Sequence, residues 1–267
     1  MLFRSVTGAT GFVGQHLVAT LARHGFRLRL LVRRWKPVPS LQGVDAELVL
    51  GDLSEDRALQ ELVAGVDAVV HAGGLIKARD PANFHKVNAE ATARLAERAG
   101  GALFLLLSSL AAREPQLSPY AASKRAAEQM LEAWGGRWLA VRAPAVYGPG
   151  DRETLAYFKA SAGGLAPEPM SSAARLSLIH VADLCEALAL AVERPPGPGI
   201  YEIDDGHPGG YGYGDMAAAA ATALGRRALR VKVPRPVMAA LAGFNRLRGG
   251  NQILTAGKVA ELFHDDW

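Results

Sequence analysis

Three glycines recur at every third position in the run T-G-A-T-G-F-V-G, from Thr7 to Gly14. The run follows a short strand pattern and opens a helical one, which is the setting of a dinucleotide-binding turn. The first glycine can take backbone angles closed to other residues, the second lets a pyrophosphate approach the main chain, and the third lets the helix pack closely. The helix N-terminus then faces the anion. A tight turn without a ligand is the alternative. The residues expected to contact a dinucleotide here are Gly8, Thr10, Gly11, Phe12 and Val13.

Short β-rich runs alternate with helical patterns through the first half of the chain. Strands are expected near residues 28–32, 47–50, 66–71, 102–107 and 138–142, and helices near residues 12–24, 81–99 and 119–134. Several of these strands are apolar throughout, which favours a parallel sheet covered on both faces. The predicted fold class is α/β, a doubly wound parallel sheet (Rossmann fold) with a small C-terminal α/β cap.

The pattern loosens after residue 150. We predict a dinucleotide-binding Rossmann domain over residues 1–150 and a substrate-binding cap region over residues 151–267, interleaved with the core. Residues 163–172 are rich in Gly, Pro and Ser and are expected to form a mobile loop, a plausible lid. Further elements expected in this half are a helix at 181–193, a strand at 199–203, and helices at 215–224, 236–247 and 255–263.

Both ends of the sequence depart from the expected pattern. Arg4 and Ser5 interrupt the apolar stretch where the first buried strand should lie, leaving little of that strand. We hypothesise that residues 1–5 are not native, because M-L-F-R-S is also the translation of a sequencing-adapter end. The sequence stops at F-H-D-D-W directly after a helical pattern, and we expect it to be truncated there.

The composition narrows the class of protein. The chain has 267 residues, 49% of them hydrophobic and 21% charged, and no apolar stretch of bilayer-spanning length. One cysteine, Cys185, excludes an internal disulfide framework, and it lies in a helical apolar pattern as a small core residue, so a cytoplasmic location is expected. The net charge of +4 is small and scattered, which argues against nucleic acid and fits a phosphorylated small molecule. No metal site is expected, since no cluster of Cys, His and carboxylates has ligand spacing.

Acid/base chemistry is indicated by Tyr120 and Lys124 in the run Y-A-A-S-K, with Ser109 eleven residues upstream. A spacing of four puts both side chains on one helix face, where the ammonium of Lys124 favours the phenolate of Tyr120. A free tyrosine has a pKa of ~10, so such a neighbour makes it a usable acid/base at neutral pH. An ordinary exposed helix face is the alternative.

The choice of cofactor depends on the residues after the second strand, which ends L-L-V-R-R. An acidic residue there would bind a ribose 2′-hydroxyl and a basic one would accept a 2′-phosphate. Arg33 and Arg34 favour NADP, with NAD possible, although two solvated surface arginines would look the same. Asp52 and Leu53, after the third strand, suit an adenine pocket, and a polar turn explains Asp52 almost as well.

The motifs together resemble the extended short-chain dehydrogenase/reductases, the NAD-dependent epimerase/dehydratase family. T-G-A-T-G-F-V-G, H-A-G-G, Ser109, Y-A-A-S-K and V-Y-G-P-G occur in the family's order over residues 1–190. The resemblance implies that Tyr120 gives or takes the substrate proton, that Ser109 hydrogen-bonds the same oxygen, and that Lys124 also binds the nicotinamide ribose. Ser108 would be structural. Asn88 would support a catalytic water or a backbone turn. The resemblance adds to the cofactor site Ala72, Gly73, Gly74, Pro144, Ala145 and Val146.

The substrate is less constrained than the reaction. The segment from Ser109 to Tyr120 is shorter than in many sugar-nucleotide epimerases, so we favour an NADP-linked carbonyl reductase resembling the dihydroflavonol-reductase or hydroxysteroid-dehydrogenase branches. There are two alternatives. One is a nucleotide-sugar epimerase or dehydratase that retains its NAD. The other is a non-catalytic subunit that binds NADPH and serves as a sensor or in assembly. Arg175 is the candidate substrate contact, and His180 and Asp183 are interpreted as a structural helix start. The resemblance also implies a possible homodimer through helices 81–99 and 119–134.

Overall fold

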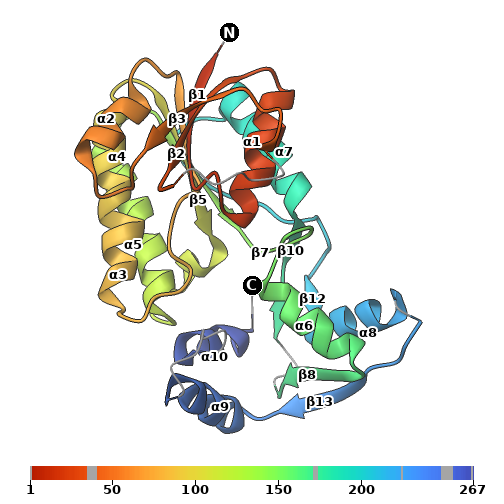
Figure 1. The fold of residues 1–267 in the computed structure, drawn as a ribbon. Helices are drawn as coiled ribbons and strands as arrows, with labels where there is room; N and C mark the ends of the chain where they lie inside the picture. Colours follow the sequence, from red (N-terminus) through yellow and green to blue (C-terminus); the bar gives the residue numbers. More distant parts are fainter. Residues whose placement is uncertain (1, 35–40, 171–173, 224, 248–254, 266) are drawn as a thin grey trace. The chain divides into compact units, whose positions relative to one another are not determined.

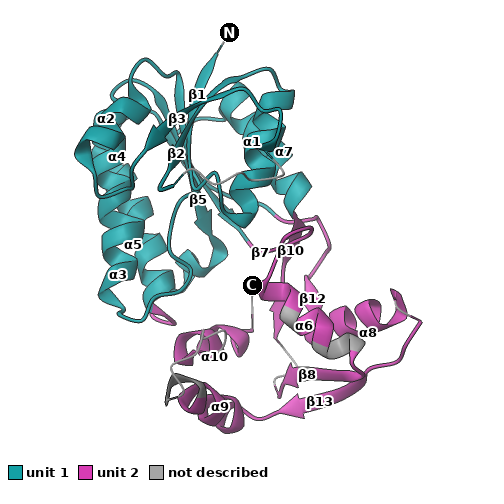
Figure 2. Ribbon diagram, in the orientation of Figure 1, with its two compact units in different colours: residues 1–115, 119–143, 181–203 teal, residues 116–118, 144–180, 204–267 magenta. Residues whose placement is uncertain are grey.

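The computed structural model describes residues 2–34, 41–170, 174–223, 225–247, 255–265 and 267. The chain divides into two compact units (Figure 2). Unit 1 contains residues 1–115, 119–143 and 181–203, and unit 2 contains residues 116–118, 144–180 and 204–267.

A seven-stranded sheet in which every pairing is parallel forms the centre of unit 1. Its spatial order is β11-β6-β5-β4-β1-β2-β3. The strands are β1 (Phe3–Thr7), β2 (Arg27–Val32), β3 (Ala46–Leu50), β4 (Ala68–His71), β5 (Leu103–Ser109), β6 (Trp138–Ala143) and β11 (Gly199–Glu202). The predicted doubly wound Rossmann sheet is therefore confirmed.

Helices cover both faces of this sheet (Figure 1). One face carries α1 (Phe12–Arg23) and α7 (Val181–Glu193), and the other carries α2 (Asp56–Val63), α4 (Ala91–Ala99) and α5 (Pro119–Trp134). Side chains such as Val69, Phe104 and Leu139 are fully buried between the layers, which explains why the central strands are apolar throughout. Ahead of α4 the chain forms α3 (Ala82–Phe84) and a π-helical segment, η2 (His85–Glu90), where the sequence pattern predicts a plain α-helix.

The first strand is complete despite its two polar residues. Val6 of β1 aligns with Leu30 of β2 and with Val70 of β4. The guanidinium of Arg4 lies 4.6 Å from the ring centroid of Phe26 and donates to the Val192 carbonyl at 3.3 Å. Among the described residues, Arg4 Nε and Ser5 Oγ have no hydrogen-bond partner. The expectation that little of this strand would form was wrong, because stacking and ladder pairing accommodate the buried arginine.

Unit 2 is built from short strands and four helices within the described residues. Its strands pair as β7 (Ala145–Tyr147) with β10 (Leu178–His180), β9 (Arg175–Leu176) with β12 (Tyr211–Gly212), and β8 (Leu165–Pro169) with β13 (Leu229–Val233). Its helices are α6 (Glu153–Ala162), α8 (Tyr213–Ala223), α9 (Arg235–Leu247) and α10 (Ala256–Leu262). A small core around Leu176, Leu178 and Met216 packs against aromatic side chains.

The loop expected over residues 163–172 is largely a strand, so that prediction was wrong within the described residues. β8 occupies Leu165–Pro169 and pairs in parallel with β13, while residues 171–173 lie outside the described part. Pro167 and Pro169 lower the strand propensity of this run. However, β8 pairs on one side only, and a proline, which has no N–H to donate, is tolerated in such an edge strand. The sequence pattern gave no prediction for β13 and α2, nor for α6, β7, β9, β10 and β12.

Cys185 is fully buried in α7, as the sequence pattern predicts, and burial raises the pKa of its thiol to about 12. No described helix has both the length and the apolar composition required to span a bilayer. The described residues also contain no group of three or more His, Cys, Asp or Glu arranged to hold a metal ion.

Candidate active site

The glycine turn between β1 and α1 is closely packed against the loop after β4. Gly8 has φ +75°, and a Cβ added there would lie 2.7 Å from the main chain of Ala72 and Gly73. A Cβ on Gly14 would lie 1.9 Å from the Gly8 carbonyl oxygen. Gly11 is the N-cap of α1 and offers no side chain to the first turn of that helix. The turn therefore fits a dinucleotide, because its backbone and the helix N-terminus are left for a pyrophosphate.

A buried chain of hydrogen bonds joins this turn to the helix layer. Gly73 N–H donates to Thr7 Oγ1 at 3.0 Å, and Thr7 Oγ1 lies 2.6 Å from His71 Nδ1. His71 Nε2 lies 3.0 Å from Thr92 Oγ1, whose hydroxyl donates to the Asn88 carbonyl at 2.6 Å. These partners assign the proton to Nε2 of a neutral imidazole. Burial lowers the pKa of His71 to about 3, with a smaller contribution from the charge of Lys124.

Asn88 binds the loop after β4 through its side-chain amide. Its Oδ1 accepts from Leu75 N–H at 2.7 Å, and its Nδ2 donates to the Leu75 carbonyl at 2.9 Å and to Ser123 Oγ at 2.9 Å. Ser123 in turn donates to the Tyr120 carbonyl at 2.7 Å. Of the two roles expected for Asn88, these contacts correspond to support of a backbone turn.

Lys124 is the buried cation of the site. Its side chain donates from Nζ to the Leu107 carbonyl at 2.8 Å, near the carboxyl end of β5. A Cβ built on Gly74 would lie 3.8 Å from Nζ and 2.9 Å from Asn88 Oδ1, so these three residues meet at one point. Burial lowers the pKa of Lys124 to about 8, and the charge of Glu128 opposes the shift. The ammonium is therefore protonated at neutral pH but close to its titration range.

The two serines at the end of β5 have different partners. Ser108 Oγ donates to Glu128 Oε1 at 2.6 Å inside the protein, which supports the structural role expected for it. Ser109 is the N-cap of the short 3₁₀ helix η3 (Leu110–Arg113), and its Oγ accepts from Ala111 N–H at 3.2 Å. Tyr120 is the second residue of α5, is half-buried, and packs edge-on against Phe84 with ring centroids 6.1 Å apart.

A buried ion pair fixes α5 to the sheet. Glu128 on α5 is fully buried, and its carboxylate accepts from Arg142 Nε at 2.9 Å and from Arg142 Nη2 at 2.7 Å. Arg142 also reaches Glu202 of β11 at 3.0 Å. The pKa of Arg142 is raised, chiefly by its hydrogen bond to Glu128. This pair holds the helix that carries Tyr120 and Lys124 in a fixed register on the strands.

The remaining predicted cofactor residues lie at three places. Arg33 and Arg34 are exposed after β2. Asp52 Oδ1 accepts from Ser54, and these hydrogen bonds lower the pKa of Asp52, with a smaller contribution from Arg33. Leu53 is partly buried against the core of unit 1. The segment Pro144–Val146 follows β6 directly and belongs to unit 2.

Several residues of this site carried no functional prediction. The hydrogen-bonded chain and the ion pair are made by His71, Thr92, Ser123, Glu128 and Arg142. Each is a polar residue inside an otherwise apolar strand or helix face, which is the only sequence signal that could have selected them.

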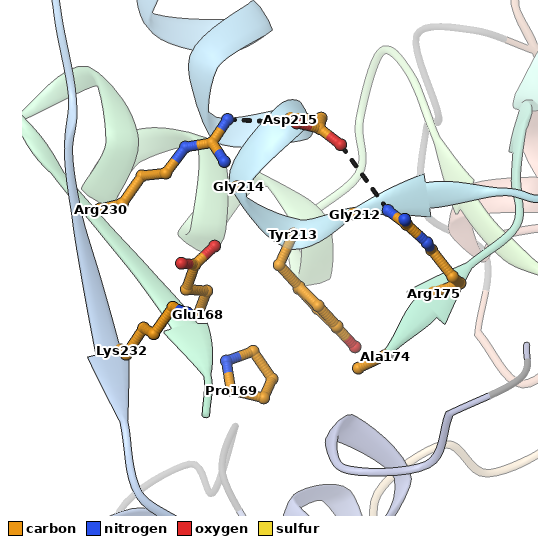
Figure 3. A pocket seen from close by; sticks show the side chains of 10 residues that line it. All are labelled: Glu168, Pro169, Ala174, Arg175, Gly212, Tyr213, Gly214, Asp215, Arg230 and Lys232. Carbon is orange, nitrogen blue, oxygen red and sulfur yellow. Dashed lines mark hydrogen bonds and ion pairs between the residues drawn. The ribbon is translucent and has the colours of Figure 1, made fainter. Parts of the chain in front are cut away.

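Unit 2 contains a polar cavity of about 590 Å³ (Figure 3). Arg230 and Lys232 of β13 and Glu168 of β8 line one part of it. Arg175 and Asp215 lie 3.8 Å apart at another part, and Asp215 also accepts from Arg230 at 3.1 Å. The sequence-selected Arg175 therefore belongs to a cluster of charges around a cavity.

Comparison with known proteins agrees with the fold and with the family that the motifs indicate. The family described as "NAD dependent epimerase/dehydratase family" matches residues 5–204. A ceramide reductase of Caulobacter vibrioides is 41% identical over 98% of this chain and 84% of its own length. A 4-hydroxy-2-methyl-3-oxo-4-farnesyl-3,4-dihydroquinoline-1-oxide ketoreductase of Stigmatella aurantiaca is 30% identical over 76% of this chain and 68% of its own. The solved structure of MoeE5 with UDP-glucose and NAD has a TM-score of 0.72 and 26% identity, covering 86% of this chain and 85% of that one.

The chain belongs to the NAD-dependent epimerase/dehydratase family, as its motifs predicted. The proteins that it resembles include a ceramide reductase, a ketoreductase and a structure with bound UDP-glucose and NAD. The protein is an NAD(P)-dependent oxidoreductase.

Proposed function

We propose that the protein is an NADPH-dependent reductase that converts a ketone on a long-chain lipid of the ceramide class to a secondary alcohol. The observation that carries the proposal is the buried Lys124 ammonium, 2.8 Å from the Leu107 carbonyl and one helical turn after Tyr120. Burying a cation is costly, so a buried lysine suggests a function. Lowering the pKa of the Tyr120 phenol, four residues earlier on the same helix, is the function that this position supports.

The residues of the β1–α1 turn and the loop after β4 would hold the cofactor. Gly8, Gly11 and the first turn of α1 would take the pyrophosphate, and Lys124 would reach the nicotinamide ribose. When bound, the cofactor supplies the hydride that reduces the carbonyl carbon. Arg33 and Arg34 are exposed where an adenosine 2′-phosphate would lie, which supports NADP over NAD.

The chain's own residues would handle the oxygen of the substrate. As the carbon accepts the hydride, the Tyr120 hydroxyl gives its proton to the carbonyl oxygen, so that C=O becomes CH–OH. Ser109 Oγ hydrogen-bonds the same oxygen and orients it toward Tyr120. The Lys124 ammonium, present below about pH 8, stabilises the phenolate that Tyr120 leaves behind.

Two observations support a lipid ketone as substrate. The ceramide reductase and the farnesyl-quinoline ketoreductase both act, by their names, on molecules with long apolar chains. The polar cavity of unit 2, with Arg175, Arg230 and Lys232, is suited to the polar head of such a molecule rather than to its chains.

Replacing the proposed proton donor tests the mechanism. Tyr120→Phe removes only the hydroxyl, so NADPH affinity should stay the same while turnover of a long-chain 3-ketone falls by ~100-fold or more. NADPH oxidation at 340 nm measures turnover and fluorescence titration measures binding. Tyr201→Phe, which removes a half-buried hydroxyl bonded to the Gly197 carbonyl, is the matched control. Equal activity of the Tyr120→Phe and wild-type proteins would refute the assignment.

A nucleotide-sugar epimerase or dehydratase is the second candidate, supported by the similarity to MoeE5 with UDP-glucose and NAD. Such an enzyme reduces and reoxidises the same cofactor molecule within one turnover, so tightly retained NAD after purification would favour it. A reductase should instead release NADP⁺ and be purified largely free of dinucleotide.

We also propose a homodimer and a cytoplasmic location. The helices at 81–99 and 119–134 could pair across a two-fold axis, which light scattering would test. The single cysteine of the sequence is compatible with a reducing compartment.

A further inference from the structure

The C-terminal part of unit 2 carries large apolar side chains on its surface. On α9, Val237, Leu241 and Phe244 are 48%, 52% and 53% exposed and are spaced by four and three residues, so they form one stripe along the helix. The opposite face of α9 is the packed one, since Ala242 is 5% exposed. An exposed apolar stripe on a helix is typical of a surface that binds a partner or a membrane.

The strand before α9 continues this apolar surface. Side chains alternate along β13, so Arg230 and Lys232 face the cavity while Leu229 and Val231 face the other way. Leu229 is 68% exposed and its cross-strand neighbour on β8, Leu165, is 56% exposed. Only Pro234 separates β13 from α9, so the two apolar rows are consecutive in the chain.

The same region is strongly basic. Between Asp215 and Glu261 the sequence contains eight arginines and lysines and no aspartate or glutamate, although the whole chain has 26 acidic residues. Arg226, Arg227 and Arg235 are exposed. Exposed arginines precede β13 and separate it from the apolar stripe of α9 in the sequence. Exposed apolar and cationic side chains in one short segment match the surface of an anionic bilayer, where the apolar ones enter the interface and the cations contact phosphates. Two copies of this surface would repel each other, and nucleic acid would leave the aliphatic side chains in water.

We propose that β13 and α9 form a docking surface for anionic phospholipid bilayers. Only the purpose of this contact, to give the active site access to a ketone embedded in the bilayer, rests on the proposed function. The binding surface itself depends only on the exposure and charge of these residues.

Vesicle flotation tests the surface directly, without reference to activity. The full chain should float with phosphatidylcholine vesicles containing phosphatidylglycerol and not with pure phosphatidylcholine. Val237→Glu with Leu241→Glu should weaken partitioning by about tenfold or more, because two apolar contacts become charges repelled by the bilayer. Arg226→Ala with Arg227→Ala should weaken it by about tenfold at low salt. Leu190→Glu, on α7 of unit 1 at 46% exposure, should leave it unchanged.

Other outcomes would either overturn the docking surface or distinguish it from the proposed function. The docking surface would be overturned if the wild-type protein did not float, or if Leu190→Glu reduced vesicle binding as much as Val237→Glu with Leu241→Glu does. It would also be overturned if the wild type formed a dimer that this double variant dissociates, or if it bound a DNA duplex tightly. Circular dichroism and NADPH binding verify that each variant is folded. Vesicle binding without reduction of any long-chain ketone would reject the proposed function alone, and reduction of a detergent-dispersed ketone without vesicle binding would reject the docking surface alone.

Discussion

One ion pair in each unit illustrates two ways of holding charged side chains. In unit 1 the Glu128–Arg142 pair is 2.7 Å long, with side chains 0% and 11% exposed, and Ser108, Arg125 and Glu202 make further polar contacts with it. In unit 2 the Asp215–Arg230 pair is 3.1 Å long, with side chains 61% and 52% exposed. The first arrangement fixes a helix on a sheet, whereas the second leaves charges available to a ligand. The pair in unit 1 therefore holds secondary structure together, whereas the pair in unit 2 remains open to solvent.

The test with the largest expected effect removes one acidic side chain from each unit. Glu128→Ala should lower the free energy of unfolding by ~3 kcal/mol or more, because Arg142 and Ser108 lose a buried partner. Asp215→Ala should change it by less than ~1 kcal/mol, since water replaces an exposed partner. Urea denaturation followed by circular dichroism measures both. Similar losses in the two variants would contradict the contrast between the units.

A second test uses the buried histidine of unit 1. The folded-state pKa of His71 is about 3, below its unfolded value, so the unfolded chain binds the extra proton. The stability that depends on neutral His71 is full above pH ~6.5 and is lost progressively as the pH falls toward 3. Between pH 6.5 and pH 5 we expect a loss of ~2 kcal/mol in the free energy of unfolding.

The matched variants for this test are His71→Asn and His207→Asn. In His71→Asn, the free energy of unfolding should fall less between pH 6.5 and pH 5 than it does in the wild type. Replacing the exposed His207 of unit 2 should leave this pH dependence as in the wild type. An unchanged slope in His71→Asn would show that another group controls the acid sensitivity.

The smallest expected effect concerns the exposed arginines of unit 1. Arg33→Ala with Arg34→Ala should weaken NADPH binding by ~10-fold or more, the scale of lost charge-assisted contacts to a phosphate, with little change for NADH. Isothermal titration with both dinucleotides measures this, and Arg194→Ala is the control for loss of an exposed positive charge. Equal losses for NADPH and NADH would exclude recognition of the 2′-phosphate.

Local patterns predicted the parts of the site that depend on neighbours in sequence. The glycine spacing predicted the turn at Gly8, and the helix expected over residues 119–134 has those bounds as α5. The chain from Thr7 through His71 and Thr92 to Asn88 could not be predicted, because Thr7 and His71 are 64 residues apart and meet only when β1 pairs with β4.

The errors have equally particular causes. Ladder pairing and the Phe26 ring outweighed the polarity of Arg4 in β1, and one-sided pairing outweighed the two prolines of β8. In both places a contact made by the folded chain overrode a local preference. The π-helical turn at Asn88 has no sequence signature of its own, and it coincides with the hydrogen bonds that join Asn88 to the loop after β4.

The position of Cys185 has a practical consequence for spectroscopy. Its thiol is the only one in the sequence, is fully buried in α7, and resists deprotonation. Thiolate-directed reagents should therefore leave the native chain unlabelled. A cysteine introduced at an exposed position can then carry a dye or spin label at a single defined place, without first mutating the native sequence.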